Sequence, residues 1–287
     1  MGVLDTITWV AVDTETTGIN PFRHELVEIG AVRFTLQGGI SERFQVLIRP
    51  KHKFDPKARA VNLITPEEIA KYAIELEEAL PAFFAFLRND LLLFHNAPFD
   101  LAFIARSAQK IRIPLPRNKY YDHLYFSRTH FPDRPSHSLR QLKQQLNIDT
   151  GQAHRALADA EATALIFLDA LHKRAGEITS KKKFARLMGK ARRVSNFEIR
   201  LPENLDEILK YFSRAIKARQ LLKINYRQKT GEPVTATVRV LDFLILNQRL
   251  FLKALPYPPK EPTIIPLQDA IIYDPDRGPI QFLSQRH

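Results

Sequence analysis

The hydrophobic and polar positions of the first 172 residues alternate between strand-like and helix-like patterns. Three apolar, β-branched runs come first, and a Gly-Gly turn separates the second from the third, which is typical of an antiparallel meander. Strand and helix patterns then follow one another, which predicts a mixed sheet flanked by helices. We expect strands at 9–13, 26–34, 44–48 and 91–94, and helices from 65, at 76–87, at 97–109, from 138 and at 156–173.

The pattern changes near residue 200. A helical pattern leads there into short strand-like runs that are separated by turn residues and by a proline-rich segment. Several short strands at such close spacing predict a small β-barrel or sandwich. We therefore expect two domains, residues 1–172 and 201–287, joined by a linker at 173–200. The second domain should hold a helix at 205–219 and strands at 222–228, 234–240, 243–246, 250–254 and 263–265.

The net charge of +12 is concentrated in the expected linker. Residues 1–172 carry 20 basic and 20 acidic residues, whereas residues 173–193 carry nine basic residues and one acid. Such a run favours an arm that binds a polyanion, although charge runs are often only solvated surface. Within it we expect substrate contacts from Lys181, Lys182 and Lys183.

Composition excludes several classes of protein. The chain has no cysteine, so it has no disulfide scaffold, no thiolate nucleophile and no zinc site built on cysteine. No apolar run approaches the roughly 20 residues that a membrane-spanning helix needs. The N-terminal segment lacks the basic start of a secretory signal. We expect a cytoplasmic protein that makes no contact with membranes.

Four acidic side chains occupy the ends of the expected elements. Asp13 and Glu15 lie two residues apart at the end of the first strand, so both project to one face. Asp100 begins one helix and Asp159 another. Four carboxylates cannot all ionise at close quarters without a cation, and oxygen-only ligands suit Mg²⁺ or Mn²⁺. Two such ions about 3.5–4 Å apart would stabilise the attacking and leaving oxygens of a phosphodiester.

A histidine accompanies the fourth acid. His154 precedes Asp159 by five residues, at the start of the last helix of the first domain. From there it can face the same site and take a proton from an attacking water. Each signal is weak alone, because a D-x-E pair is often a solvated turn and a histidine before a helix is often a surface residue. Their order and structural context together indicate a metal-dependent nuclease.

The segments that hold these residues resemble the DEDDh (DnaQ-like) 3′–5′ exonuclease family, which has an RNase H-like fold. The resemblance covers about residues 7–172 and rests on VAVDTETTG, ELVEIGAVRF, HNAPFDLAFI, SLRQLKQQLNI and HRALADAEATALIF. Histidine in place of tyrosine at position 154 is typical of the DEDDh branch. The resemblance also implies that the backbone around Thr16 seats the terminal nucleotide.

The resemblance assigns a role to each site residue. The four acids of the family fall on Asp13, Glu15, Asp100 and Asp159, and its general base falls on His154. By the same resemblance, Asp13, Glu15 and Asp159 hold the catalytic ion. Asp13 and Asp100 engage a second ion.

The C-terminal part has a fainter resemblance, over about residues 203–275, to the WYL domain. It rests on 216–226 (IKARQLLKINY), 250–254 and 264–271. In that family a helix leads into an Sm/SH3-like barrel that binds nucleic acid or nucleotide-type ligands, which implies a small, mostly-β module here. The signature tripeptide reads Leu250-Phe251-Leu252, a departure at its first two positions, and the closing segment lacks the usual arginine.

The resemblance implies a 3′–5′ exonuclease that releases nucleoside 5′-monophosphates from DNA, with single strands preferred. An exoribonuclease of the oligoribonuclease or RNase T kind uses the same chemistry, since pocket details distinguish the 2′-OH. A different class is a nucleic-acid or ligand sensor whose WYL-like module controls the nuclease. A proofreading subunit of a polymerase is also open. The expected partners are single-stranded DNA or RNA 3′ ends, or a second copy bound through the C-terminal module.

Overall fold

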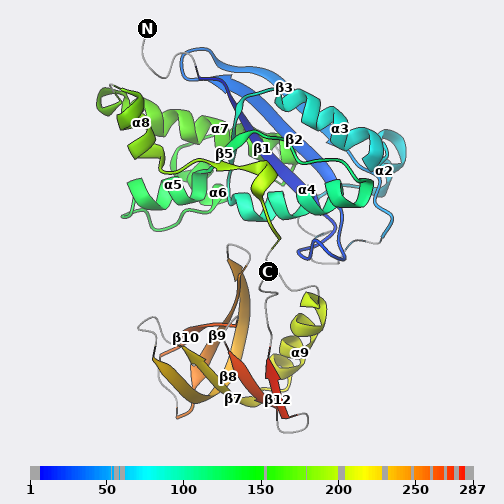
Figure 1. Cartoon of the computed structure of the whole chain (residues 1–287), viewed down its shortest axis with the longest axis vertical. Coiled ribbons are helices and arrows are strands. Elements are labelled where there is room, and N and C mark those ends of the chain that lie inside the picture. Colours follow the sequence, from blue (N-terminus) through cyan, green and yellow to red (C-terminus); the bar gives the residue numbers. More distant parts are fainter. Residues whose placement is uncertain are drawn as a thin grey trace. The chain divides into compact units, whose positions relative to one another are not determined.

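The computed structural model describes residues 7–52, 54, 58, 62–151, 154–178, 180–199, 204–227, 232–246, 249–258, 261–267, 270–274 and 278–281. The chain divides into two compact units, Met1–Glu198 and Ile199–His287. Each unit is built on its own six-stranded sheet (Figure 1). Among the described residues, none of the helices combines the length and the apolar character that crossing a bilayer requires.

The sheet of the first unit has the strand order β3-β2-β1-β4-β5-β6. Strands β1, β2 and β3 form an antiparallel meander, whereas β4 and β5 run parallel to β1. The mixed sheet predicted from the sequence is therefore confirmed. The strands are β1 (Trp9–Thr16), β2 (Leu26–Thr35), β3 (Gly39–Leu47), β4 (Leu91–Phe94), β5 (Lys119–Asp122) and β6 (Arg192–Arg193).

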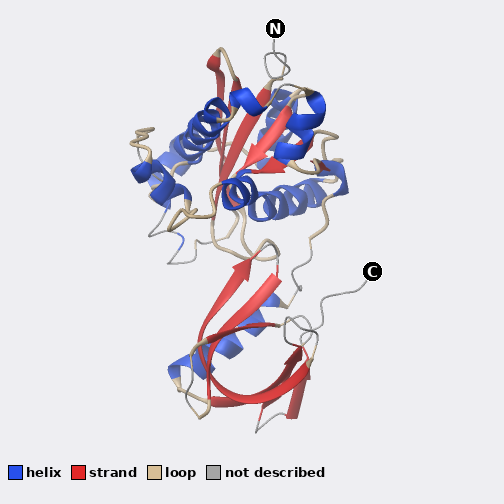
Figure 2. Cartoon of the chain, turned by 90° about the vertical axis from the view of Figure 1, so that its left-hand side faces the viewer, coloured by secondary structure: helices blue, strands red, loops and turns tan. Residues whose placement is uncertain are grey.

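Helices cover both faces of this sheet (Figure 2). Alternate residues of β1 divide between two cores: Val10 and Val12 pack with residues of α3 and α4, while Trp9 and Ala11 pack with residues of α7 and α8. Central β1 is therefore buried on both faces up to the point where its polar residues begin. The helices are α2 (Pro66–Tyr72), α3 (Leu76–Leu87), α4 (Ala97–Ile111), α5 (His123–His130), α6 (Leu139–Gln145), α7 (Ala156–Lys173) and α8 (Lys181–Met188).

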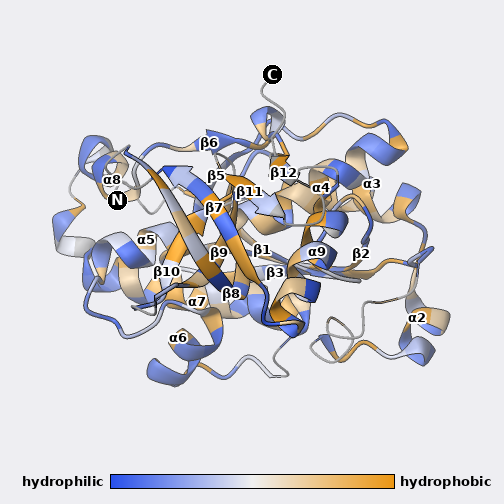
Figure 3. Cartoon of the chain, turned by 90° about the horizontal axis from the view of Figure 1, so that it is seen from below, coloured by the Kyte–Doolittle hydropathy of each residue, from blue (hydrophilic) through white to orange (hydrophobic). Residues whose placement is uncertain are grey.

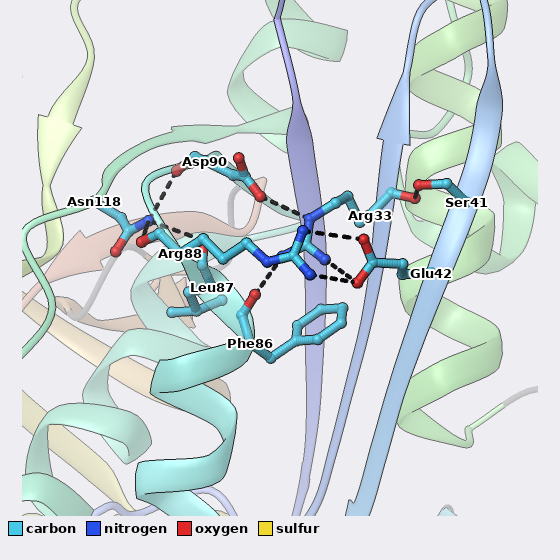
Figure 4. A network of polar contacts seen from close by, with 8 residues as sticks. All are labelled: Arg33, Ser41, Glu42, Phe86, Leu87, Arg88, Asp90 and Asn118. Carbon is cyan, nitrogen blue, oxygen red and sulfur yellow. Dashed lines mark hydrogen bonds and ion pairs between the residues drawn. The ribbon is translucent and has the colours of Figure 1, made fainter.

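A buried arginine joins the edge of this sheet to the turn before β4 (Figure 4). Arg33 of β2 is 3% exposed, and its Nε donates to Asp90 Oδ2 at 2.7 Å. Its other nitrogens donate to Glu42 of β3 and to the carbonyl of Phe86. A buried charge is tolerated only when it is paired and hydrogen-bonded in this way. The network fixes the β2–β3 hairpin against the end of α3.

The segment expected to be a linker belongs largely to the first unit, which extends to Glu198. Phe184 and Met188 of α8 are buried against the core around Trp9, and β6 pairs with β5. The sequence predicted a linker here because residues 173–193 include nine basic residues. Phe184 and Met188 are four residues apart and so lie on one face of a helix, but this short apolar pattern did not stand out among the charges.

The second unit is a helix, α9 (Leu205–Lys217), followed by an antiparallel sheet. Hydrophobic and hydrophilic residues alternate along β7, as expected for a sheet with one buried face (Figure 3). The mostly-β module is therefore confirmed. The strands, in the order β10-β9-β8-β7-β11-β12, are β7 (Leu221–Arg227), β8 (Pro233–Leu246), β9 (Arg249–Pro256), β10 (Thr263–Pro266), β11 (Ile271–Asp274) and β12 (Gly278–Gln281).

Two details of this sheet correct the expectation. The barrel is not closed, because the outer strands β10 and β12 do not pair with each other in the part of the chain that the structure describes. Closure would require that pairing. The two strands expected at 234–240 and 243–246 form the single strand β8, with a bulge between Val240 and Asp242. A bulge bends a strand without ending it. It also interrupts the alternation of apolar and polar residues, so the sequence pattern there resembled a turn between two strands.

Candidate active site

The acids of β1 lie at its carboxyl end. Asp13 and Glu15 follow the alternation of Trp9 and Ala11, so they occupy the face of the sheet that α7 covers. Thr14 lies on the opposite face. The strand continues past the predicted end at residue 13, because Asp13 to Thr16 still pair with β2.

Thr14 connects β1 to the third acid. Its hydroxyl donates a hydrogen bond to Asp100 Oδ1 at 2.8 Å. Asp100 lies in the first turn of α4 and is 2% exposed. The α4 helix begins directly after β4, which runs parallel to β1, so the start of α4 comes to the same edge of the sheet. This topology places Asp100 beside the D-x-E segment.

A glycine brings the fourth acid to the cluster. Gly30 of β2 pairs with Asp13, and a Cβ built on it would lie 2.1 Å from the backbone nitrogen of Leu157. Only a glycine there lets the first turn of α7 reach the sheet, and that turn carries Asp159. One carboxylate oxygen from each of Asp13, Glu15 and Asp159 lies within 4.8 Å of the other two.

A fifth carboxylate anchors this arrangement. Glu28 of β2 faces Glu15 in the strand register and is fully buried. It accepts hydrogen bonds from the guanidinium of Arg155 at 3.0–3.3 Å and from the backbone N–H of Ala156 at 2.8 Å. Arg155 also donates to Glu68 at 2.8 Å. The sequence did not single out Glu28 or Arg155, because their pairing depends on which residues of β1, β2 and α7 meet.

Burial raises the pKa values of Asp13, Glu15, Asp100 and Asp159. Burial and then the charge of Asp159 raise the pKa of Glu15 to about 8. Burial raises the pKa of Asp100 to about 7, against the hydrogen bond from Thr14. The pKa of Asp13 is raised by burial and then by Asp100 and Asp159, and burial also raises the pKa of Asp159. At neutral pH Glu15 therefore retains its proton unless a cation replaces it.

His154 belongs to the same site. Its backbone N–H donates to Asp159 Oδ2 at 3.3 Å, and its φ of +62° lies in the left-handed region. The charge of His154 is among the causes that lower the pKa of Asp159 against its burial. The structure thus brings together all five residues that the sequence placed at the catalytic centre.

The backbone around Thr16 is held firmly. The Thr16 hydroxyl donates to the carbonyl of Gly18 at 2.7 Å, and the Thr16 carbonyl accepts from Asn62 Nδ2 at 3.2 Å. Asn62 is buried, so this bond ties the end of β1 to the segment before α2. That this backbone seats a terminal nucleotide stays a prediction.

The three lysines expected to contact substrate lie elsewhere. Phe184 of α8 packs on Trp9 at the beginning of β1, with ring centroids 6.1 Å apart. Since β1 rises about 3.3 Å per residue, Asp13 and Glu15 lie four and six residues further along the strand, about 13 and 20 Å from that end. Lys182 and Lys183 are exposed, whereas the side chain of Lys181 falls outside the described residues. The structure does not bring these lysines to the acids.

A lysine that the sequence did not single out lies at the acids instead. Lys143 of α6 has its Nζ 3.6 Å from Asp159 Oδ1, and its side chain is 12% exposed. A lysine on a short amphipathic helix ordinarily indicates a solvated face, so no sequence signal distinguished it.

We expect Glu15→Gln to stabilise the metal-free protein at pH 8. The pKa of Glu15 is raised from 4.5 to about 8, so between these pH values the folded protein holds a proton that the unfolded chain has released. Stability is therefore lost as pH rises through that window, and glutamine removes the loss. In EDTA, the variant should gain at least about 1 kcal/mol at pH 8, roughly 2–4 °C in Tm, and little at pH 5.

Glu25→Gln is the matched control for this experiment. Hydrogen bonds from His52 and the charge of Lys110 hold the pKa of Glu25 below its ordinary value, although burial opposes them. Its substitution should therefore give no stabilisation at pH 8. Equal gains for Glu15→Gln at pH 5 and pH 8 would contradict the assigned electrostatics.

Comparison with known proteins identifies the family. The family model described as Exonuclease, RNase T type, matches residues 10–167, which is more than half of the chain. The chain belongs to this exonuclease family. Among its relatives, the PolC-type DNA polymerase III of Thermotoga petrophila is 34% identical over 161 residues and that of Oceanobacillus iheyensis 33% over 160. These matches cover 56% and 55% of this chain but only 12% and 11% of the relatives.

Solved structures have the same fold. The nuclease domain of 3′hExo, a DEDDh family member bound to rAMP, has a TM-score of 0.52 and 19% identity, covering 60% of this chain and 94% of that one. An E. coli ExoI–ssDNA complex has a TM-score of 0.54 and 18% identity, covering 86% of this chain and 54% of that one. The predicted exonuclease domain is confirmed by the family match, and its predicted mixed α/β fold is confirmed by these structures.

Proposed function

We propose that the chain hydrolyses the 3′-terminal phosphodiester bonds of DNA, single strands preferred, and releases nucleoside 5′-monophosphates. The observation that carries the proposal is the close approach of three carboxylates, with oxygens within 4.8 Å of one another, beside a histidine loop. The family supports it, because the exonuclease match spans these four residues and Asp100.

The donor set fits Mg²⁺ or Mn²⁺. Carboxylate oxygens are the preferred ligands of these hard cations, and burial together with the neighbouring acids raises the pKa values of Asp13 and Glu15, which a bound cation would offset. Asp13, Glu15 and Asp159 would hold one ion, and Asp13 with Asp100 a second. When bound, the two ions stabilise the charge that develops on the attacking and leaving oxygens.

The chain's own residues supply the proton transfer and the positioning. Neutral His154 takes a proton from a water molecule as the water oxygen attacks the terminal phosphorus. The bond from phosphorus to the 3′ oxygen of the preceding nucleotide breaks, and the shortened strand keeps that oxygen as its new 3′-OH. Water is the only co-reactant. We assign the binding site of the terminal nucleotide to the backbone around Thr16, which is held in place by the hydrogen bond from Asn62 Nδ2 to the Thr16 carbonyl.

One digestion panel tests the proposal. Single-stranded DNA, duplex DNA and RNA, each labelled at the 5′ or the 3′ end, are incubated with Mg²⁺ or Mn²⁺. The expected result is immediate release of the 3′ label as a mononucleotide, gradual shortening of 5′-labelled DNA, and slower digestion of duplex and RNA. Asp13→Asn serves as the control for contaminating nucleases. Faster digestion of RNA would favour the exoribonuclease, and release of the 5′ label first would exclude the proposed polarity.

We further propose that the second unit binds the nucleic-acid strand. Tyr273 of β11 is 39% exposed, and Nζ of Lys223, its partner in the register with β7, lies 5.8 Å from the ring centroid. An exposed aromatic ring beside a cation is the combination on which single-stranded bases stack. Two alternatives remain for this unit. It could bind a ligand that controls the nuclease, or it could hold two copies of the chain together.

The basic run is expected to contact long strands only. Three lysines in the first turn of α8 are unfavourable to the helix dipole, and bound phosphates would offset that cost. With a catalytically inactive Asp13→Asn chain, replacing Lys181, Lys182 and Lys183 with alanine should flatten the slope of log K against log salt by about 2. The measurement is a binding isotherm of long single-stranded DNA at several salt concentrations.

Two controls complete that experiment. A very short oligonucleotide, which cannot span the roughly 13–20 Å from the acids to the end of β1 on which α8 packs, should give the same slope with and without the lysines. Tyr273→Ala should weaken binding without changing the slope, because it removes a stacking surface and no charge. An unchanged slope on long DNA would show that the basic run is only solvated surface.

A further inference from the structure

Lys143 carries a positive charge in an unusual position. Its Nζ is shielded from solvent and has no hydrogen-bond partner among the described residues. Among the described residues it pairs with Asp159, whose Oδ1 lies at 3.6 Å, which is longer than a hydrogen bond. An ammonium has three donors, and leaving them unsatisfied in a buried place costs free energy. A buried ammonium with unsatisfied donors therefore requires an explanation that an exposed lysine does not.

The carboxylate that Lys143 faces is engaged on both oxygens. Asp159 Oδ2 accepts the backbone N–H of His154 at 3.3 Å, and Oδ1 faces the ammonium. The charge of Lys143 is also the first of the causes that counter the effect of burial on Asp159. A cation that binds at Asp159 is therefore repelled by the ammonium of Lys143, which already lies beside Oδ1 of this carboxylate.

We infer that Lys143 is a tethered counter-ion of the metal centre, which neutralises Asp159 in the metal-free protein and opposes the entry of a divalent ion. The inference rests on the proposed function, because it requires the acids to bind metal. A unit charge within about 4–6 Å changes the equilibrium of a charged group by about one to three powers of ten. Lys143 should thus weaken the binding of the first ion by at least about tenfold.

The test is the affinity of the full-length chain for Mn²⁺ alone, measured by calorimetry at pH 8. Lys143→Met removes the charge and keeps much of the side-chain volume, and it should bind Mn²⁺ at least about tenfold more tightly than the wild type. Lys143→Arg keeps the charge and should restore weaker binding. Lys110→Met is the matched control, because Lys110 pairs at 3.4 Å with Glu25, outside the cluster, and its loss should leave Mn²⁺ affinity unchanged.

The outcomes separate the inference from the proposed function. Equal or weaker Mn²⁺ binding by Lys143→Met overturns the inference, since loss of packing alone would loosen the site rather than tighten it. If that variant does not fold, Lys143→Gln, which is neutral and polar, carries the same expectation. A wild type that binds no Mn²⁺, or binds it equally well as Asp13→Asn, overturns the proposed metal centre itself.

Discussion

Asp13→Asn is expected to lower the rate of 3′-nucleotide release by roughly 10³-fold or more, because loss of even one fixed stabilising group in a catalytic site costs about 10²–10³. Asp13 is the acid that we assign to both ions, and Glu15, Asp100 and Asp159 all contribute to raising its pKa. Removing its carboxylate should therefore remove both sites at once. EDTA should reproduce the loss in the wild type, and added Mg²⁺ or Mn²⁺ should restore activity only there.

The same substitution should leave the fold intact. Burial and the neighbouring acids destabilise the charge of Asp13, so a neutral isostere relieves repulsion in the metal-free protein. The melting temperature of Asp13→Asn in EDTA should be no lower than that of the wild type. Asp133→Asn, an exposed aspartate on the segment before α6, is the matched control and should keep full activity. Full activity of Asp13→Asn would show that the site lies elsewhere.

The acids could be predicted because each sits at the end of a local element. Strand alternation places Asp13 and Glu15 on one face, and helix starts mark Asp100 and Asp159. These signals need only a few consecutive residues. The approach of α7 to β2, by contrast, depends on the missing side chain of Gly30, whose importance appears only when strand register is known.

Charged residues were harder to interpret than apolar ones. Lys143 and the basic run both have the sequence pattern of solvated helix surface, yet Lys143 is largely buried at Asp159 while Lys182 and Lys183 are exposed. The sequence pattern around a charged residue does not show which residue it will pair with, because the partner lies on another segment of the chain. The α8 helix shows the same limit, since the apolar residues that tie it to the core around Trp9, among them Phe184 and Met188, are interspersed with basic ones.

His154→Asn is expected to lower the rate by about 10²–10⁴-fold, the usual range for one general acid or base. Asparagine is chosen because it tolerates the left-handed backbone at this position, where φ is +62° and alanine would add strain. The backbone N–H that holds Asp159 is kept, so Mn²⁺ affinity should change little. A loss of rate without a loss of metal binding separates proton transfer from assembly of the site.

The pH profile identifies the group that carries the proton. A general base must be neutral, so the wild-type rate should fall as the pH drops and the base becomes protonated. Glu15 and Asp100, whose pKa values are raised to about 8 and about 7, would add their own acid limb. Saturating Mn²⁺ suppresses that contribution, because the ion displaces their protons. His52→Asn, a surface histidine beside Glu25, is the matched control and should retain the full profile. If the acid limb persists in His154→Asn at saturating Mn²⁺, another group activates the water.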